Sequence, residues 1–166
     1  MIYTERLKLV PIDLSYLNDI YELWSDYEVV KYTNVNLMTS LKECEDKVSF
    51  RINDQTDWNY PNNFVVLLED KAIGLAGFPI MNKEKAEFGF YYQILRNCWG
   101  KGYASEVAES LLKYIFDYYP NATVFAGSVT ENTASLKILK NLGFKEISID
   151  EKAFKGYDIA HFKYVK

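Results

Sequence analysis

The sequence has little cysteine, no long apolar run and no basic cluster. Its two cysteines, Cys44 and Cys98, form no Cys-x-x-Cys pair, and only His161 is available to join them, so we expect neither a metal site nor a disulfide. No stretch of about 18 apolar residues suggests a membrane span. The net charge is −4 and no basic run exceeds two residues, so we expect no nucleic-acid partner.

The length and bulk composition are those of one folded domain. The chain has 166 residues, of which 49% are hydrophobic, and no repeat or Gly/Ser-rich linker divides it. These features predict a single domain over residues 1–166 with a full hydrophobic core. The N-terminal residues lack the apolar segment of a signal peptide, so we expect a cytoplasmic protein.

Hydrophobic periodicity predicts helices and strands in a mixed order. Helical spacing of apolar residues predicts helices over 13–24, 40–52, 104–119 and 133–142. Asp13 is the expected N-cap of the first helix, and Gly143 is expected just past the last. Strands are predicted over 64–69, 72–78, 87–94, 123–129, 144–149 and 158–165. The strand–helix–strand unit over 87–129 predicts one parallel pairing with a right-handed crossover, and the remaining pairs should be antiparallel.

A glycine-containing loop joins the aromatic strand at 87–94 to the long helix. Gly100 and Gly102 stand at alternate positions, which lets the backbone turn tightly without a Cβ in the way. The first amides of a helix are unpaired donors, and the helix dipole favours an anion there. The junction is therefore a candidate pyrophosphate site, although alone it fits an ordinary glycine-rich helix start equally well. Tyr103 and Ser105 depart from the Walker and Rossmann patterns.

Two motifs resemble the GNAT superfamily of N-acetyltransferases, and within it the RimJ/RimL-like branch. The first motif is Trp99-Gly100-Lys101-Gly102-Tyr103-Ala104-Ser105-Glu106. The second is Asn132-Thr133-Ala134-Ser135 running to Leu142-Gly143-Phe144. The opening Thr4-Glu5-Arg6-Leu7 is similar to the first strand of that branch, which places a strand at 5–11. The resemblance implies an α/β GNAT-like fold, with a central mixed, mostly antiparallel twisted sheet of about seven strands flanked by about four helices.

The resemblance also implies acetyl-CoA as co-substrate and assigns residues to it. Backbone amides from Gly100 to Ala104 would hold the pyrophosphate, Asn132 would bond the pantetheine arm, and Ser135 would protonate the departing thiolate. The full cofactor-binding set is Ile94, Trp99, Gly100, Lys101, Gly102, Tyr103, Ala104, Asn132 and Ser135. Most family members carry a tyrosine acid where this chain has Leu139, and the loop has Asn97 where Gln or Arg is common. Both residues also have a purely structural interpretation. Asn132 could only cap its helix, and Ser135, in the first turn, could only hydrogen-bond the backbone.

Acetyl transfer requires a neutral amine and a stabilised thioester oxygen. A strand amide near Tyr92 to Ile94 is the candidate oxyanion donor, and Glu87 acting through water is the candidate base. Both also fit plain structural roles, Tyr92 in packing and Glu87 as a surface charge. Glu106 is expected to brace the loop. The acceptor site is expected to include Trp24, Trp58 and Tyr91.

The predicted function is N-acetylation of a primary amine by direct attack in a ternary complex. The acceptor is a protein N-terminus or a small-molecule amine, and a low-pKa α-amine suits a site without an obvious base. The alternatives are a non-catalytic acetyl-CoA sensor and a partner-binding domain without a nucleotide site. Sequence leaves open whether the protein is a monomer or a homodimer. It also leaves open the register of the strand before the loop. The branch that the motifs resemble usually has a Gly-Tyr pair where this chain has Tyr91 and Tyr92, and the nearest glycine, Gly89, stands two residues earlier.

Overall fold

The computed structural model describes residues 1–55 and 60–166 and resolves into two compact units. The first unit comprises Met1–Gly77 and Tyr92–Leu111, and the second comprises Phe78–Tyr91 and Leu112–Lys166. The chain passes between the units within the strand that precedes the glycine loop and again within helix α4 (Tyr103–Tyr118). Each unit has its own sheet and its own buried residues.

The sheet of the first unit contains five strands. Their order is β1 (Ile2–Tyr3), β2 (Leu7–Pro11), β3 (Asn63–Leu68), β4 (Lys71–Gly77) and β7 (Tyr91–Ile94). The pairs from β1 to β4 are antiparallel. Strand β3 is buried along nearly its whole length, as its run of apolar residues predicts. At β4, a Cβ on Gly74 would lie 2.1 Å from the main-chain oxygen of Gln93, so the β7 backbone occupies the space that a side chain at this position would need.

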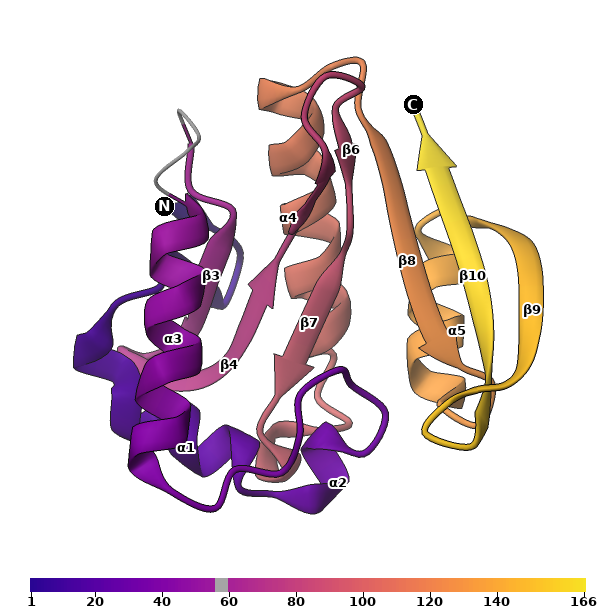
Figure 1. The fold of residues 1–166 in the computed structure, drawn as a ribbon. Coiled ribbons are helices and arrows are strands. Elements are labelled where there is room, and N and C mark those ends of the chain that lie inside the picture. Colours follow the sequence, from indigo (N-terminus) through magenta and orange to yellow (C-terminus); the bar gives the residue numbers. More distant parts are fainter. Residues whose placement is uncertain (56–59) are drawn as a thin grey trace. The chain divides into compact units, whose positions relative to one another are not determined.

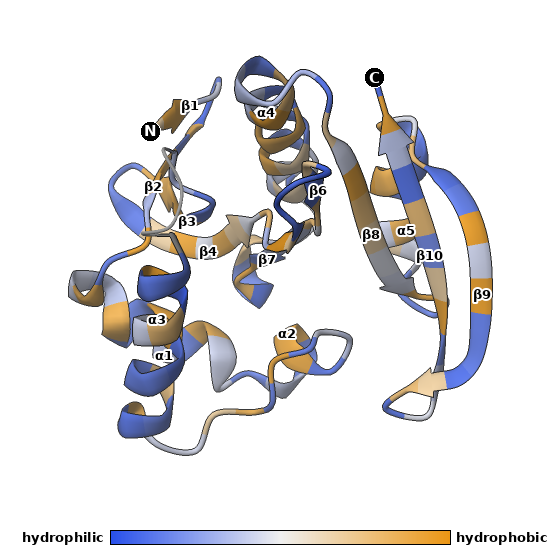
Figure 2. Cartoon of the chain, turned by 45° about the horizontal axis from the view of Figure 1, so that its top comes forward, coloured by the Kyte–Doolittle hydropathy of each residue, from blue (hydrophilic) through white to orange (hydrophobic). Residues whose placement is uncertain are grey.

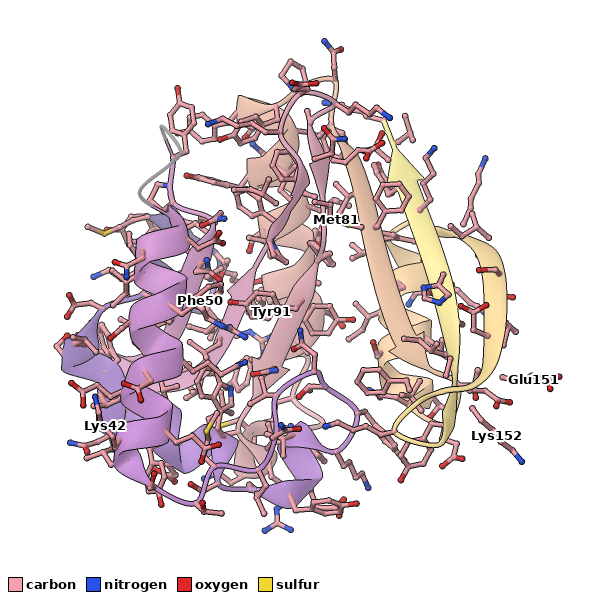
Figure 3. The ribbon with its side chains drawn as sticks, in the orientation of Figure 1. Lys42, Phe50, Met81, Tyr91, Glu151 and Lys152 are labelled. Carbon is pink, nitrogen blue, oxygen red and sulfur yellow. The ribbon has the colours of Figure 1, made fainter. Side chains whose placement is uncertain are left out.

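Helices of the first unit follow their sequence signals. The predicted helix at 13–24 is a 3-10 turn (Leu14–Tyr16) followed by α1 (Leu17–Trp24), and Asp13 caps it by accepting a 2.8 Å bond from the Ser15 amide. α3 (Leu41–Gln55) packs against α1 and β3 (Figure 1). Its apolar face buries Cys44 and Val48, whereas Lys42 and Phe50 project outward (Figure 3). A short helix, α2 (Tyr27–Val30), was not predicted.

The second unit contains the other five-stranded sheet. Its strands are ordered β5 (Ile80–Asn82), β6 (Glu87–Phe88), β8 (Thr123–Val129), β10 (Tyr157–Val165) and β9 (Lys145–Phe154), so the last strand of the chain lies between its two neighbours (Figure 1). β6 and β8 are parallel, which confirms the pairing predicted from the strand–helix–strand unit. The pairs β5–β6, β8–β10 and β9–β10 are antiparallel.

Aromatic rings fill the core of the second unit. Phe88 contacts Phe78 and Tyr119 with centroids 5.4 and 5.0 Å apart, and Phe144 contacts Phe90 and Tyr164 at 5.4 and 5.3 Å. Helix α5 (Thr133–Asn141) lies beside β8. The outer strand β9 is exposed along most of its length, and its hydrophobic residues are few among hydrophilic ones (Figure 2).

The prediction of one sheet of about seven strands is wrong. The described residues form ten strands in two sheets. The predicted strand at 87–94 divides into β6 and β7, which belong to different sheets. Just past β6, the Gly89 amide donates a 2.7 Å bond to the oxygen of Pro79, the residue before β5. β1 and β5 are too short to show an alternating pattern.

A membrane-spanning helix is not among these elements. Within the described ranges, every helix falls short of the length or the apolar character that a bilayer crossing needs.

Candidate acetyl-CoA site

The glycine loop opens helix α4 in the first unit. Both Gly100 and Gly102 have positive φ, 74° and 82°, which is the left-handed conformation that glycine adopts at least cost. The first helical bond runs from the Glu106 amide to the Gly102 oxygen at 3.1 Å. The amides of Tyr103 and Ala104 precede that bond and take no part in the helical ladder, so they are available to an external acceptor. An anionic group suits such donors at a helix N-terminus.

The loop is fastened to strand β7 by Trp99. Its indole Nε1 donates a 2.7 Å hydrogen bond to the main-chain oxygen of Ile94, and the Leu95 amide donates a 2.8 Å bond to Ile73 on β4. Ile94 is buried, whereas Trp99 remains 47% exposed. The structure therefore joins two residues of the predicted cofactor-binding set, Ile94 and Trp99, through one hydrogen bond. Their side chains differ in access, and only the Trp99 ring is open to a ligand.

Thr4 and Arg6 brace the same loop from the N-terminal segment. Glu106 Oε1 accepts bonds from the Thr4 hydroxyl and from the Arg6 amide, the latter at 2.8 Å. Glu106 Oε2 lies 2.8 Å from Arg6 Nε and 2.7 Å from Arg6 Nη2. Arg6 Nη1 donates to the Lys101 oxygen at 3.0 Å, and the guanidinium carbon lies 4.6 Å from the Tyr103 ring centroid. The prediction that Glu106 braces the loop is confirmed, and Arg6 is a residue that the sequence reasoning missed.

Glu106 remains ionised in this arrangement. Burial favours the neutral acid, but hydrogen bonds from Thr4 and from the amide and side chain of Arg6, with the charge of Arg6, outweigh it and lower the pKa of Glu106. The result is a partly buried carboxylate–guanidinium pair with each oxygen satisfied by nitrogen or hydroxyl donors. The one sequence feature that could have drawn attention to Arg6 is its place in the segment Thr4-Glu5-Arg6-Leu7. Nothing in that segment links Arg6 to a helix residue 100 positions later.

Asn132 and Ser135 belong to the second unit, at the start of α5. The Asn132 side chain accepts a 3.3 Å bond from the Ser135 amide, and its main-chain oxygen accepts from Leu136 at 3.1 Å, so Asn132 is the N-cap of the helix. Leu139, at the position where most family members carry a tyrosine acid, is buried in the core.

The remaining predicted residues have different surroundings. Glu87 is half-buried on β6 and pairs with Thr123 of β8. Tyr91 (Figure 3) and Tyr92 are half-buried on β7. Trp24 has no exposed surface, and its indole is bonded to the Gln93 side chain, so it is a core residue here and we leave it out of the proposed acceptor site. Trp58 lies outside the described residues.

Comparison with known proteins identifies the family. A model of the GNAT acetyltransferase domain matches residues 6–145. An uncharacterized N-acetyltransferase, p20, from Bacillus licheniformis is 33% identical over 99% of this chain and 96% of its own length.

Solved structures share the fold. RimL, described as a ribosomal L7/L12 alpha-N-protein acetyltransferase in complex with coenzyme A, superposes with a TM-score of 0.86 at 14% identity, covering 98% of this chain and 95% of that one. A spermidine N-acetyltransferase from Vibrio cholerae, in complex with CoA and spermine, gives a TM-score of 0.85 at 21% identity over 96% and 95% of the two chains. RimL, whose branch the motifs of this chain resemble, therefore has the same fold. This chain belongs to the GNAT family of acetyltransferases.

Proposed function

We propose that this acetyltransferase moves the acetyl group of acetyl-CoA to a primary amine, by direct attack of the neutral amine in a ternary complex. The observation that carries the proposal is the loop from Gly100 to Ala104, with both glycines at positive φ and the first-turn amides of α4 outside the helical ladder. A diphosphate suits such a group of donors at a helix N-terminus. No comparison favours a non-catalytic acetyl-CoA sensor.

The loop would hold the pyrophosphate of acetyl-CoA through its backbone. Gly100 has open space where a Cβ would lie, so a ligand can approach the backbone there. Lys101 is exposed beside it and would add a positive charge. Trp99 offers a half-exposed ring next to the main chain of Ile94, the residue where strand β7 ends. Asn132 would bond the pantetheine arm with the part of its amide not used in capping.

The reaction forms one bond and breaks one. The amine nitrogen bonds to the acetyl carbon, the carbon–sulfur bond breaks, and the thiolate leaves. The amine loses a proton, which Glu87 would accept through water and then release to solvent. The thiolate gains a proton from the Ser135 hydroxyl, which would take one back from solvent. A strand amide near Tyr92 would donate to the thioester oxygen as it gains charge; removing such a donor typically costs roughly 3 kcal/mol of transition-state stabilisation.

The acceptor is either a protein N-terminal α-amine or a small-molecule amine. RimL is named for the first kind of substrate, and the Vibrio cholerae enzyme for a polyamine. An α-amine has a pKa near about 8, whereas an alkylamine such as that of lysine has one near about 10.4, so at about pH 7 the α-amine is neutralised more cheaply. We favour the α-amine because the proposed base acts only through water. Tyr91 would line the acceptor side.

The test is an acceptor panel with detection of free thiol. Acetyl-CoA is mixed with the protein and with short peptides of varied N-termini, amino acids, polyamines or aminoglycosides. Ser135→Ala is compared with Ser110→Ala, which removes a hydroxyl that bonds only the Val107 oxygen within α4. Thiol release with one amine class, reduced in Ser135→Ala and unchanged in Ser110→Ala, supports both the function and the role of Ser135. Equal release from all three proteins removes that role, and no release with any amine contradicts the proposed function.

A further inference from the structure

Arg6 connects the helix N-terminus to the glycine loop without being part of either. One edge of its guanidinium, Nε and Nη2, lies within 2.8 Å of Glu106 Oε2. The remaining nitrogen, Nη1, donates to the Lys101 oxygen at 3.0 Å. A planar guanidinium fixes the directions of these donors relative to one another, which a lysine ammonium cannot do.

Arg6 is itself held in place from behind. Thr4 and Leu7 form a tight turn, in which the Thr4 amide donates to the Leu7 oxygen at 3.0 Å and the Leu7 amide donates to the Thr4 hydroxyl oxygen at 2.8 Å. The Thr4 hydroxyl and the Arg6 amide then both donate to Glu106 Oε1. The side chain and the main chain of Arg6 are thus tied to the same carboxylate, so the guanidinium has little freedom to turn away from Lys101.

The bond to the Lys101 oxygen determines where the next amide points. The Lys101–Gly102 peptide is trans, so the Lys101 oxygen and the Gly102 N–H point in opposite directions. Because Arg6 draws the oxygen toward itself, the Gly102 N–H is directed away from the guanidinium, to the other side of the loop. A Cβ on Gly102 would stand 3.4 Å from Arg6 Nη2, so the guanidinium lies beside the loop at this position as well.

We propose that Arg6 is a positioning residue for acetyl-CoA, which orients the Gly102 amide toward the pyrophosphate through the Lys101 carbonyl, while Glu106 and Thr4 hold Arg6 in place. The proposal rests on the proposed function, because it takes the loop to be the pyrophosphate site. The charge of Arg6 is neutralised by Glu106, so its effect on CoA is directional. The N-terminal segment therefore sets the affinity of a loop about 95 residues away in the sequence.

The test measures CoA binding by calorimetry, which needs no acceptor. Arg6→Lys, Arg6→Met and Glu106→Gln are each expected to weaken CoA binding about tenfold, the size of one lost hydrogen bond to a charged group. The double variant Arg6→Met/Glu106→Gln should bind CoA no more than about twofold less tightly than whichever single variant binds it less tightly, because the two residues act as one unit. Lys113→Met, which removes the Lys113–Asp117 ion pair elsewhere on α4, is the control and should bind CoA within about twofold of the wild type.

Additional readouts separate positioning from folding and from direct contact. The Gly102 amide resonance should shift on CoA addition in the wild type and much less in Arg6→Met, and kcat at saturating acetyl-CoA should change less than KM. If a variant of Arg6 or Glu106 fails to fold, Thr4→Val replaces it in the test, because it removes only one hydroxyl. We expect a smaller loss of CoA affinity from Thr4→Val than from the charge variants. Wild-type affinity in Arg6→Lys, or multiplicative losses in the double variant, would overturn the proposal. A wild-type protein that binds no CoA would instead contradict the proposed function.

Discussion

The indole nitrogen of Trp24 donates a 2.8 Å hydrogen bond to Gln93 Oε1, and both side chains are buried. The bond joins helix α1 to strand β7, two elements of the first unit that are far apart in the sequence. Arg51 of α3 lies over the Trp24 ring, with its guanidinium carbon 5.0 Å from the ring centroid. One tryptophan therefore ties two helices to the strand that leads into the glycine loop.

Replacing Trp24 by phenylalanine should destabilise the fold. The substitution removes the donor and leaves Gln93 Oε1 buried without it, which costs about 1–3 kcal/mol, in addition to the smaller ring volume. Urea unfolding followed by circular dichroism would measure the loss. Tyr27→Phe, which removes a hydroxyl from an exposed ring, is the control and should change stability by less than about 0.5 kcal/mol. A Trp24 variant as stable as this control would show that the bond contributes nothing.

Replacing Gly74 by alanine should weaken the pairing of β4 with β7. The added Cβ would stand 2.1 Å from the Gln93 oxygen and 2.9 Å from the Ile94 side chain, so the strands must move apart. We expect a loss of about 2 kcal/mol or more, because the clash is with backbone. Gly156→Ala provides the contrast, since its Cβ would meet nothing within 4 Å and only its φ of 83° opposes the change. Equal losses for both variants in urea unfolding would argue against a close approach at Gly74.

The contribution of Glu106 to stability should depend on pH. Its pKa is lower in the folded chain than in the unfolded chain, so the ionised carboxylate stabilises the fold fully above the unfolded pKa of about 4.3. That contribution is lost as the pH falls through the lower folded pKa. The gap in unfolding free energy between wild type and Glu106→Gln should thus be largest at about pH 6 to 7 and shrink below about pH 4. A gap that stays constant with pH would contradict the assignment.

The two cysteines should react at very different rates. Cys44 is fully buried, and burial, with the charge of Glu43, raises the pKa of its thiol to about 11, so little thiolate forms. Cys98 is half-buried on the turn before the glycine loop. Titration with a thiol reagent at about pH 8 should modify one group quickly in the native protein and a second only on unfolding. Cys98→Ser should abolish the fast phase; if the fast phase persists, the assignment of the two thiols is reversed.

Short stretches of sequence predict much of the local structure. Strand β8 occupies the predicted residues 123–129, and α4 is displaced by one residue from the predicted 104–119. Asp13 caps its helix and Gly143 has a φ of 91°, as their positions indicated. These features depend on hydrophobic spacing and on side chains within about four positions, so a local pattern is enough to predict them. The positive φ of Gly100 and Gly102 belongs to the same class, because glycine adopts that conformation at least cost, whereas the direction of the Lys101 carbonyl depends on the distant Arg6.

Only the tertiary structure decided which distant segments of the chain contact one another. The sequence shows one aromatic strand at 87–94, whereas strand partners divide it into β6 and β7 and assign them to different sheets. Trp24 has the spacing of a helix face and becomes a fully buried hydrogen-bond donor because Gln93 happens to face it. Arg6 has an ordinary charged side chain in the sequence and becomes a brace of the loop because Glu106 and the Lys101 oxygen meet it in the fold. Local periodicity carries no information on such partners, since the free energy of each pairing depends on segments that only folding brings together.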